Sequence, residues 1–435
     1  MSSTDTLSVG DWFSVLPVTR AQVLAGFALF IAFVIESWEM MIIIFSSGAI
    51  SSEFALDAQA TGSLIGAMFL GMIPGALLWG QLTGRFGRKK TLLISLALYP
   101  LFPVLSALAP SFETLWAIRF AGGIVLAGPL VITFPYFVEL VPVRHRGPAT
   151  VCLSAGWPVG LLVAVGVTTL FADSGWRVTI GFSAVVGLWA LVILKCVPES
   201  PYWLAERGEL ARAKQALQRL SAGQVNIGAI AAPTTSDETI AFSRIFTGSR
   251  LRLTIVQTVI NFCFSWGYWG MASWMPALLA ERGLSAPQGL GFIALSALFM
   301  FPGYLSASYL TAKLGRKGVM LTYVFCAAVA GFGFAYSGSL AEMYAWNFAL
   351  SFFSLGAWGV WNTWLGEIYD TRARGAGTAW GVSAQRVANA IAPVAIGSMM
   401  ATNDFFTTVA FISLFLAVTF VAATLLPETE GKALA

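Results

Sequence analysis

Residues 84–90 read Gly-Arg-Phe-Gly-Arg-Lys-Lys, and this short basic stretch separates two long apolar segments. Part of it returns 228 residues later, because residues 87–89 and residues 315–317 are both Gly-Arg-Lys. The same shift carries Pro74 onto Pro302. A long repeat kept in one register indicates two homologous halves, each built around a basic loop.

A second charged motif keeps this register. Glu139 and Arg146 return as Glu367 and Arg374, again 228 residues apart. Each glutamate ends an apolar segment, and each arginine lies in the loop that follows. The repeat therefore covers two loops in each half and extends over most of the chain.

The composition indicates a membrane protein. Of the 435 residues, 57% are hydrophobic and 11% are charged, whereas soluble proteins have about 25% charged residues. The net charge of +4 is small and is spread over loops, so a nucleic-acid partner is not expected. The four cysteines are scattered in apolar segments without metal-ligand spacing, which predicts no metal site.

Twelve segments reach the length of about 20 apolar residues that a membrane span needs. The expected fold class is therefore an all-α membrane protein of twelve transmembrane helices in two pseudo-symmetric halves. The expected spans are residues 21–47, 60–83, 91–109, 113–138, 149–171, 177–197, 252–279, 287–312, 318–338, 342–366, 376–401 and 405–426.

One long polar segment separates the sixth span from the seventh. Residues 204–220 within it carry apolar side chains at helical spacing, whereas residues 221–237 have the composition of a linker. The expected divisions are a tail (1–20), a six-helix bundle (21–197), a loop with a helix (198–250), a second six-helix bundle (251–427) and a tail (428–435).

The distribution of Lys and Arg predicts the orientation. With the N-terminus inside, all but four of the 25 basic residues fall in inner loops or termini, the exceptions being Arg119, Arg177, Arg282 and Arg386. Such an imbalance places both termini in the cytoplasm. The expected location is the cell (inner) membrane.

Three motifs in this arrangement resemble the major facilitator superfamily over essentially the whole chain. Residues 80–89 (Gly-x-Leu-x-Gly-Arg-x-Gly-Arg-Lys) are similar to its signature between spans two and three. Residues 198–204, beginning Pro-Glu-Ser-Pro, and residues 427–429 (Pro-Glu-Thr) resemble the sugar-porter-type branch and its metabolite:proton symporters. The family usually has an acid at position 84, where this chain has glycine, and Ala312 stands at the equivalent place.

The resemblance implies that charges at the cytoplasmic ends of the helices gate the transporter. Carboxylates and guanidiniums there can pair while that side is closed and separate when it opens. The alternative is that the basic residues only set the orientation. The expected gating residues are Arg85, Arg88, Glu139, Arg146, Arg316, Glu367 and Arg374.

Ionisable side chains at membrane depth are functional candidates. Glu39 is about 28 Å beyond Arg20 and Arg119 is about 30 Å from Glu139, at 1.5 Å per residue, so the two lie level. The resemblance implies that proton-coupled relatives carry an acid in span one and an arginine in span four. We expect Glu39 to carry the proton and to pair with Arg119, the alternative being a permanent salt bridge.

Glu36 lies three residues before Glu39, so the two carboxyls share one helix face. The pair resembles the Asp-x-x-Asp pattern in span one of aromatic-acid:proton symporters. Glu36 is expected to assist proton coupling or to bind a cationic substrate. The alternative is a position exposed near the outer mouth.

Arg386 is expected about 18 Å into span eleven, near the midplane. It resembles the arginine that organic-anion carriers place there, and a guanidinium suits a carboxylate. The alternative is a pairing with an acid such as Glu36. Asn389, one turn further on, is a further candidate for binding substrate.

The sugar-binding amides of span seven are absent, because Cys263, Phe264 and Trp269 occupy the matching positions. Aromatic residues are frequent instead. Trp38 and Trp266, which are 228 residues apart, are expected to line the substrate cavity, where indole faces suit a flat ring or a cation. Interfacial anchoring is the alternative.

The sequence thus predicts a secondary transporter rather than an enzyme, since it has no nucleophile elbow, phosphate loop or histidine-based site. The expected function is proton-coupled symport of a small organic anion, aromatic or monocarboxylic, by alternating access. A proton-coupled exporter of organic cations is the main alternative, and a non-transporting sensor is another. The expected partners are the substrate, protons and the lipid bilayer, with no cofactor, and the expected state is a monomer.

Overall fold

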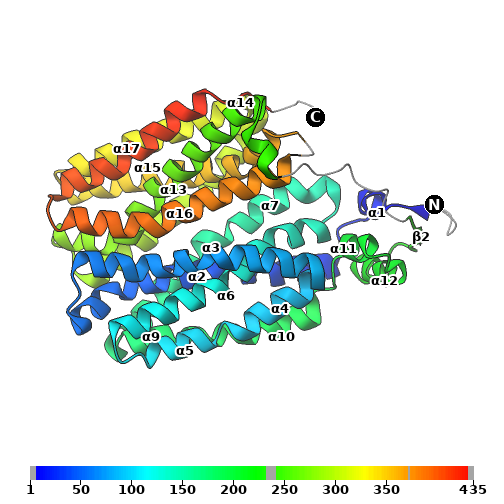
Figure 1. Ribbon diagram of the computed structural model, residues 1–435, viewed down its shortest axis with the longest axis horizontal. Helices are drawn as coiled ribbons and strands as arrows, with labels where there is room; N and C mark the ends of the chain where they lie inside the picture. The colour runs from blue at the N-terminus through cyan, green and yellow to red at the C-terminus, as the bar shows by residue number, and fades with distance from the viewer. Residues whose placement is uncertain (1–5, 232–241, 371–372, 430–435) are drawn as a thin grey trace.

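The computed structural model describes residues 6–231, 242–370 and 373–429 and is almost entirely helical (Figure 1). Parts of both tails and of the expected linker, as well as Arg372, lie outside the described residues. The N-terminal half contains α2 (Arg20–Phe54), α3 (Ala58–Phe86), α4 (Arg88–Leu98), α5 (Leu101–Ala107), α6 (Phe112–Leu140), η1 (Val143–His145), α7 (Arg146–Ser154), α8 (Gly156–Leu170), η2 (Ala172–Ser174), α9 (Trp176–Phe182), η3 (Ser183–Leu188) and α10 (Trp189–Cys196).

The C-terminal half has longer unbroken helices. Its elements are η4 (Phe242–Phe246), α13 (Ser249–Glu281), α14 (Ala286–Tyr336), α15 (Leu340–Glu367), α16 (Arg374–Met400) and α17 (Phe405–Thr424). Between the halves lie α11 (Pro201–Glu206), α12 (Leu210–Ser221) and strand β2 (Ala229–Ile230), which pairs in parallel with β1 (Thr6–Leu7) beside α1 (Val9–Val15).

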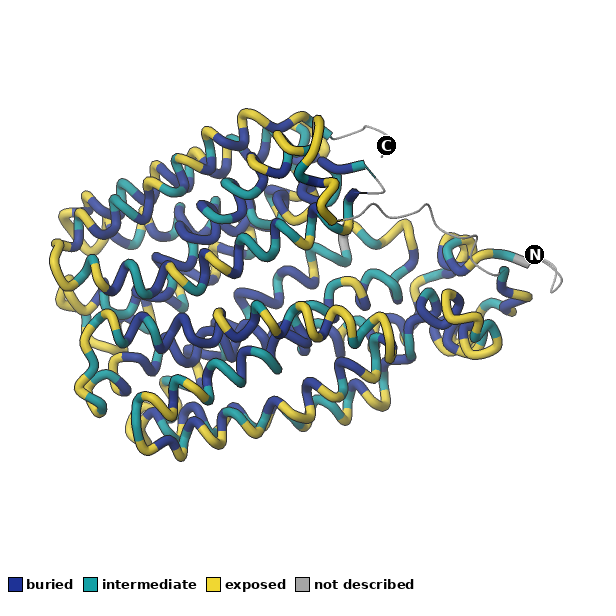
Figure 2. The backbone as a smooth tube through the Cα atoms, in the orientation of Figure 1, coloured by how far each residue is buried: buried dark blue, intermediate teal, exposed yellow. Residues whose placement is uncertain are grey.

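The expected twelve crossings can all be found in this helix order. Among the described residues, eight segments are long and apolar enough to span a membrane. One of them, α14, contains two expected spans, because the chain bends at Gly315 with φ +75°. Helices α13, α15 and α16, of 33, 28 and 27 residues, provide the remaining three. Large apolar side chains are exposed around the bundle, as a lipid-facing surface requires (Figure 2).

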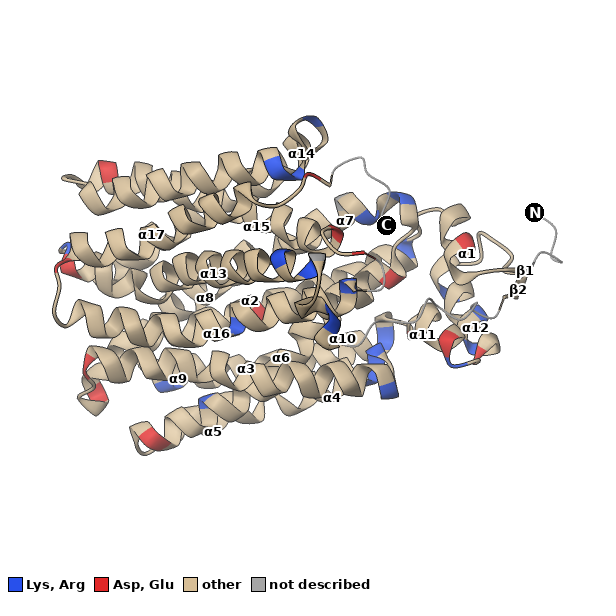
Figure 3. Ribbon diagram, turned by 45° about the horizontal axis from the view of Figure 1, so that its top comes forward, with Lys and Arg blue, Asp and Glu red and all other residues tan. Residues whose placement is uncertain are grey.

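Lys and Arg gather at the end of the bundle that also holds both described chain ends, α11 and α12 (Figure 3). We call this the basic end and the opposite one the far end. The chain turns sharply at the basic end at Gly87, whose φ is +94°, and at Gly315. Only glycine adopts such angles without strain, which explains its place in both copies of the motif.

The far end also keeps the repeat. In the N-terminal half, the guanidinium of Arg177 lies 5.7 Å from the ring of Phe54. In the C-terminal half, Arg282 lies 4.3 Å from the ring of Phe405. A shift of 228 carries position 54 onto 282 and position 177 onto 405, so the arginine and the phenylalanine have exchanged places while the cation–π contact remains.

The halves pack against each other through α3 with α16 and α8 with α14. Glycines permit close backbone approach between α3 and α16 near the far end. A Cβ on Gly62 would lie 2.2 Å from the carbonyl oxygen of Pro393, and one on Gly397 would lie 2.3 Å from that of Ala58. By contrast, a Cβ on Gly80 of α3, near the basic end, would have no neighbouring heavy atom within 4 Å. The halves are therefore in tight contact at the far end.

Candidate functional site

At the basic end, one ion pair recurs in both halves at equivalent positions, and the C-terminal half has a further pair between Arg250 and Asp370. Arg88 Nη2 lies 3.0 Å from Glu139 Oε1, and Arg316 Nη2 lies 3.1 Å from Glu367 Oε1. The Nε atom of each arginine also donates to its partner carboxylate, at 3.1 Å and 3.2 Å. Both pairs join residues of the same half and are partly exposed, so each contributes about 0–1 kcal/mol by itself.

Two further glutamates cap the helices that begin at these arginines. Glu199 accepts hydrogen bonds from the backbone N–H groups of Arg88 and Lys89, at 2.9 and 3.1 Å. Glu428 accepts from those of Arg316 and Lys317, both at 3.0 Å. A carboxylate is stabilised at a helix N-terminus by the free N–H groups and the helix dipole. Both glutamates belong to the motifs at residues 198–204 and 427–429, but the motifs alone did not predict this capping role.

The other three expected gating residues form no ion pair with any residue that the structure describes. Arg85 lies over the ring of Phe86 at 5.4 Å. Arg146 donates to the hydroxyl of Tyr202, at 2.8 Å, and to a backbone carbonyl. Arg374 has a buried Nε and Nη2 without a hydrogen-bond partner among the described residues. Gly84, where the family usually has an acid, has no neighbour within 4 Å of its Cβ position.

Glu39 is fully buried inside the N-terminal half. Its Oε2 accepts a hydrogen bond of 2.6 Å from the hydroxyl of Tyr99, while its buried Oε1 has no partner in the described structure. Tyr99 follows α4 directly, and Pro100 interrupts the span there because it lacks an N–H group. That break positions the Tyr99 hydroxyl at Glu39, a contact that the sequence analysis did not predict.

Arg119 also reaches Glu39, but in a different way from that expected. Its Nη2 lies 3.4 Å from the backbone carbonyl oxygen of Glu39 and 2.9 Å from the sulfur of Met68. No guanidinium nitrogen of Arg119 lies within 4.0 Å of a carboxylate oxygen of Glu39. The expected direct ion pair is therefore absent, although the charge of Arg119 still acts on the carboxylate.

Glu36 and Arg386 come from opposite halves. Their exposed fractions are 1% and 9%, and the charge of Arg386 acts on Glu36. The two groups are not within 4.0 Å of each other. Glu36 Oε2 and Arg386 Nε are buried without hydrogen-bond partners among the described residues. Glu36 is thus not exposed at an outer mouth, and both groups keep unused hydrogen-bonding capacity.

Trp38 and Trp266 each pack against an aromatic residue of their own half. Trp38 packs against Phe182 of its own half, with ring centroids 6.3 Å apart. Trp266 stacks on Phe415 at 4.7 Å, also within its own half. Neither indole lines the pocket described below. Sequence spacing predicted that the two would be equivalent, but it could not distinguish the helix face towards the partner half from the face towards α9 or α17.

Other aromatic residues lie between the halves. Trp269 packs against Phe69 at 4.6 Å and against Trp157 at 5.5 Å. Trp157 Nε1 donates to the hydroxyl of Tyr268, at 2.7 Å, which links α8 to α13. Asn389, with its amide oriented to satisfy both partners, accepts from Trp269 Nε1 at 3.2 Å and donates to a backbone carbonyl. Asn389 therefore orients Trp269.

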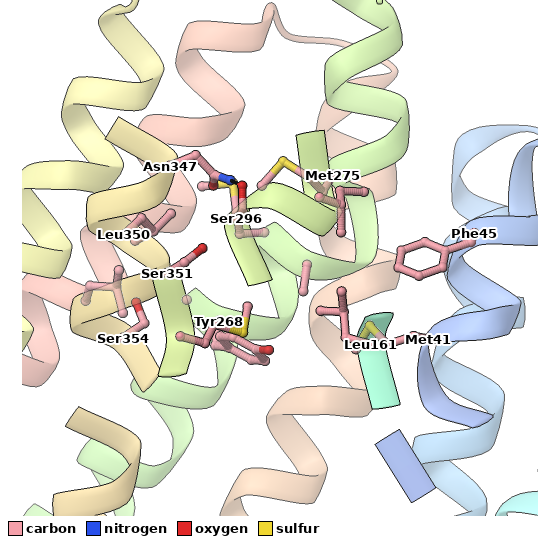
Figure 4. Close-up of a pocket in the computed structure, with 16 residues that line it drawn as sticks. Met41, Phe45, Leu161, Tyr268, Met275, Ser296, Asn347, Leu350, Ser351 and Ser354 are labelled. Atoms are coloured by element: carbon pink, nitrogen blue, oxygen red, sulfur yellow. Dashed lines mark hydrogen bonds between the residues drawn. The ribbon is translucent and has the colours of Figure 1, made fainter. Parts of the chain in front are cut away.

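A pocket opens between α13, α14 and α15 of the C-terminal half, and α2 and α8 close it from the other half (Figure 4). Methionines and aliphatic side chains form most of its wall, with Asn347 and several serines on one side. No charged residue lines it, and Arg386 is not part of it. The pocket and the buried charges are therefore separate features.

The comparisons with known proteins agree with this architecture. The model of the Major Facilitator Superfamily matches residues 27–393. The niacin transporter of Acinetobacter baylyi is 30% identical over 96% of this chain and 97% of its own. The 3-(3-hydroxy-phenyl)propionate transporter of Escherichia coli is 27% identical over 88% of each chain.

Among solved structures, a partially occluded inward-open conformation of the Escherichia coli xylose transporter is similar in fold. Its TM-score is 0.75 at 20% identity, and the match covers 96% of this chain and 100% of the other. The family match, the 30% relative and the two six-helix halves agree, and they confirm the expected fold class. The chain is a membrane transport protein, not an enzyme, and it belongs to the major facilitator superfamily.

Proposed function

We propose that this transporter couples inward proton movement to uptake of a small organic anion, aromatic or monocarboxylic. The observation that carries the proposal is the buried guanidinium of Arg386, whose Nε has no hydrogen-bond partner among the described residues. A buried charge of this kind is stabilised by a bound counter-ion, and a guanidinium suits a carboxylate. The relatives named for niacin and for a phenylpropionate carry aromatic carboxylic acids.

Glu36 has a defined part in this proposal. Its carboxylate is close enough to Arg386 for their charges to interact, yet the two do not touch. A substrate carboxylate at Arg386 would repel an ionised Glu36, so anion binding and protonation of Glu36 favour each other. The same arrangement disfavours the alternative of a cation exporter, because Arg386 would oppose a cation at Glu36.

Glu39 is proposed as the coupling carboxyl in the N-terminal half. It is buried, and it lies beside Arg119 and Tyr99. A protonated Glu39 carries no charge. Keeping it buried while the halves move therefore costs less free energy than keeping an ionised carboxylate buried. Arg119 and Tyr99 stabilise the ionised form by their charge and hydrogen bond.

The protein is proposed to lie in the inner membrane of the cell. Its basic end is proposed to face the cytoplasm. The excess of Lys and Arg at that end supports this orientation. With the far end packed tightly, the halves would then be closed to the outside. The Arg88–Glu139 and Arg316–Glu367 pairs, with Arg85, Arg146 and Arg374, are proposed to bias the rocking of the halves, and the working unit is proposed to be a monomer.

The test measures proton movement in proteoliposomes with a pH-sensitive dye inside. Nicotinate and benzoate are added in one arm and tetraphenylphosphonium in the other. The proposal is supported if a carboxylate drives inward proton flow and this flow is lost in Arg386→Ala. The flow should be retained in Arg212→Ala, which changes an exposed arginine of α12. Proton exchange driven by the cation, and unaffected by Arg386→Ala, would establish the exporter instead.

A further inference from the structure

The pocket of Figure 4 occupies the place in the C-terminal half that the Glu39 site occupies in the N-terminal half. A shift of 228 carries Glu39 onto Gly267 and Arg119 onto Asn347, and both of these line the pocket. Asn347 is shorter than the arginine at the equivalent position, whereas the place that a Cβ of Gly267 would take lies 2.7 Å from the side chain of Leu416. The pocket therefore lies where the repeat differs at two positions, 39/267 and 119/347.

The contact geometry confirms this equivalence. In the N-terminal half, Arg119 Nη2 lies 2.9 Å from the sulfur of Met68. In the C-terminal half, Asn347 Nδ2 donates to Ser296 Oγ at 2.6 Å, and Ser296 is the counterpart of Met68. The contact between a guanidinium and a thioether has thus been replaced by a hydrogen bond between two neutral side chains in the same arrangement.

Three polar side chains of the pocket form one stripe, and two more, Ser296 and Tyr268, come from α14 and α13. Asn347, Ser351 and Ser354 are spaced i, i+4 and i+7 on α15, which places them on one helix face. All three are buried, and in the described structure neither Asn347 Oδ1 nor the two serine hydroxyls have a hydrogen-bond partner. The stripe offers an acceptor followed by two hydroxyls that can donate or accept.

The rest of the pocket is apolar and involves both halves. Figure 4 shows the stripe on one side and Met41, Phe45 and Leu161 on the other. Methionine side chains make favourable contacts with aromatic rings. An ionised carboxylate would be unpaired here, and burying it without a partner is costly.

We propose that this pocket is a second binding site, for an uncharged flat molecule that carries an amide or hydroxyl on one edge. An amide matches the stripe, because its N–H donates to Asn347 Oδ1 and its carbonyl accepts from a serine hydroxyl. The ring lies against the methionine wall. Since both halves line the pocket, an occupant stabilises the conformation in which the far end is closed.

Benzamide is the probe, with benzoate as its charged counterpart, and binding is measured by titration calorimetry on the purified full-length protein. We expect benzamide to bind at one site, with affinity reduced about tenfold in Asn347→Leu and in Ser351→Ala through the lost hydrogen bond. Asn403→Leu, an exposed asparagine outside the pocket, is the matched control and should bind benzamide as the unchanged protein does.

Two results would overturn the proposal. One is absence of benzamide binding to protein whose melting curve shows that it is folded. The other is binding outside the pocket, seen as unchanged affinity in both pocket variants; if affinity were also lost in Arg386→Gln, benzamide would lie at the buried arginine. The proposed anion symport is tested separately, because a failure of benzoate to drive proton flow leaves the benzamide result unaffected.

Discussion

Replacing Glu39 by Gln separates proton coupling from substrate movement. Glutamine has nearly the same shape as a protonated glutamate, and its side-chain oxygen can still accept the Tyr99 hydrogen bond, which is 2.6 Å in the unchanged protein. The variant therefore resembles the protonated transporter but cannot release the proton. We expect it to exchange labelled substrate between the two sides and to lose accumulation driven by a pH gradient.

The size of the effect follows from the coupling. If one proton enters with each monocarboxylate, transport is electroneutral, and one pH unit supports at most a tenfold accumulation, or about 1.4 kcal/mol. In Glu39→Gln, the ratio of substrate concentration inside to that outside should fall to about 1. The assay is uptake of labelled nicotinate into proteoliposomes, with and without an imposed pH gradient, beside counterflow exchange at equal pH.

Glu53→Gln is the matched control for this experiment. Glu53 lies on the same helix as Glu39, but it is at the far end, where it pairs with Arg177 and is 43% exposed. Its substitution should leave the accumulation ratio unchanged. Tenfold accumulation retained in Glu39→Gln would falsify the assignment of the coupling carboxyl to this residue.

Two further predictions concern local contacts. Tyr99→Phe removes the hydrogen bond to Glu39, which is worth about 1.5 kcal/mol. We therefore expect proton-driven uptake to fall about tenfold while exchange at equal pH is retained. Equal losses in both assays would indicate a packing defect instead. Gly315→Ala forces a side chain into positive φ and places its Cβ 2.3 Å from Glu428 Oε2, so we expect about 1–3 kcal/mol of destabilisation and a lower melting midpoint in detergent. Gly291→Ala, in an open position of the same helix, should not lower the midpoint.

The sequence predicted the two halves and their twelve crossings because the repeat and the apolar lengths are strong, independent signals. It did not predict where spans break. The span expected at 91–109 divides after Tyr99, and the one at 149–171 divides at Ala155, three residues before Pro158. A proline ring prevents regular helix geometry over the preceding turn, but spacing alone does not show whether a helix kinks or ends there.

For the candidate site, the sequence identified the buried charges and could not assign their partners. Glu36 and Glu39 were expected on one face, and i,i+3 spacing allows that. In the structure, Glu39 meets Tyr99 inside its own half, while Glu36 interacts electrostatically with Arg386 of the other half. Residues three apart on a helix point in directions that differ by about 60°. This difference is enough to direct one carboxyl to a contact within its own half and the other to the interface between the halves.

The repeat explains why the two halves differ in chemistry while sharing a scaffold. At the basic end, both copies keep an arginine paired with a glutamate, because both halves need the same turn and the same helix start. At membrane depth that constraint is absent, and the copies have diverged: Glu39 and Arg119 in one half correspond to Gly267 and Asn347 in the other. A buried charge is costly in each half in which it occurs. If the proposed proton-binding carboxyls are confined to the N-terminal half, the C-terminal half is free to present an uncharged surface to the apolar part of a ligand.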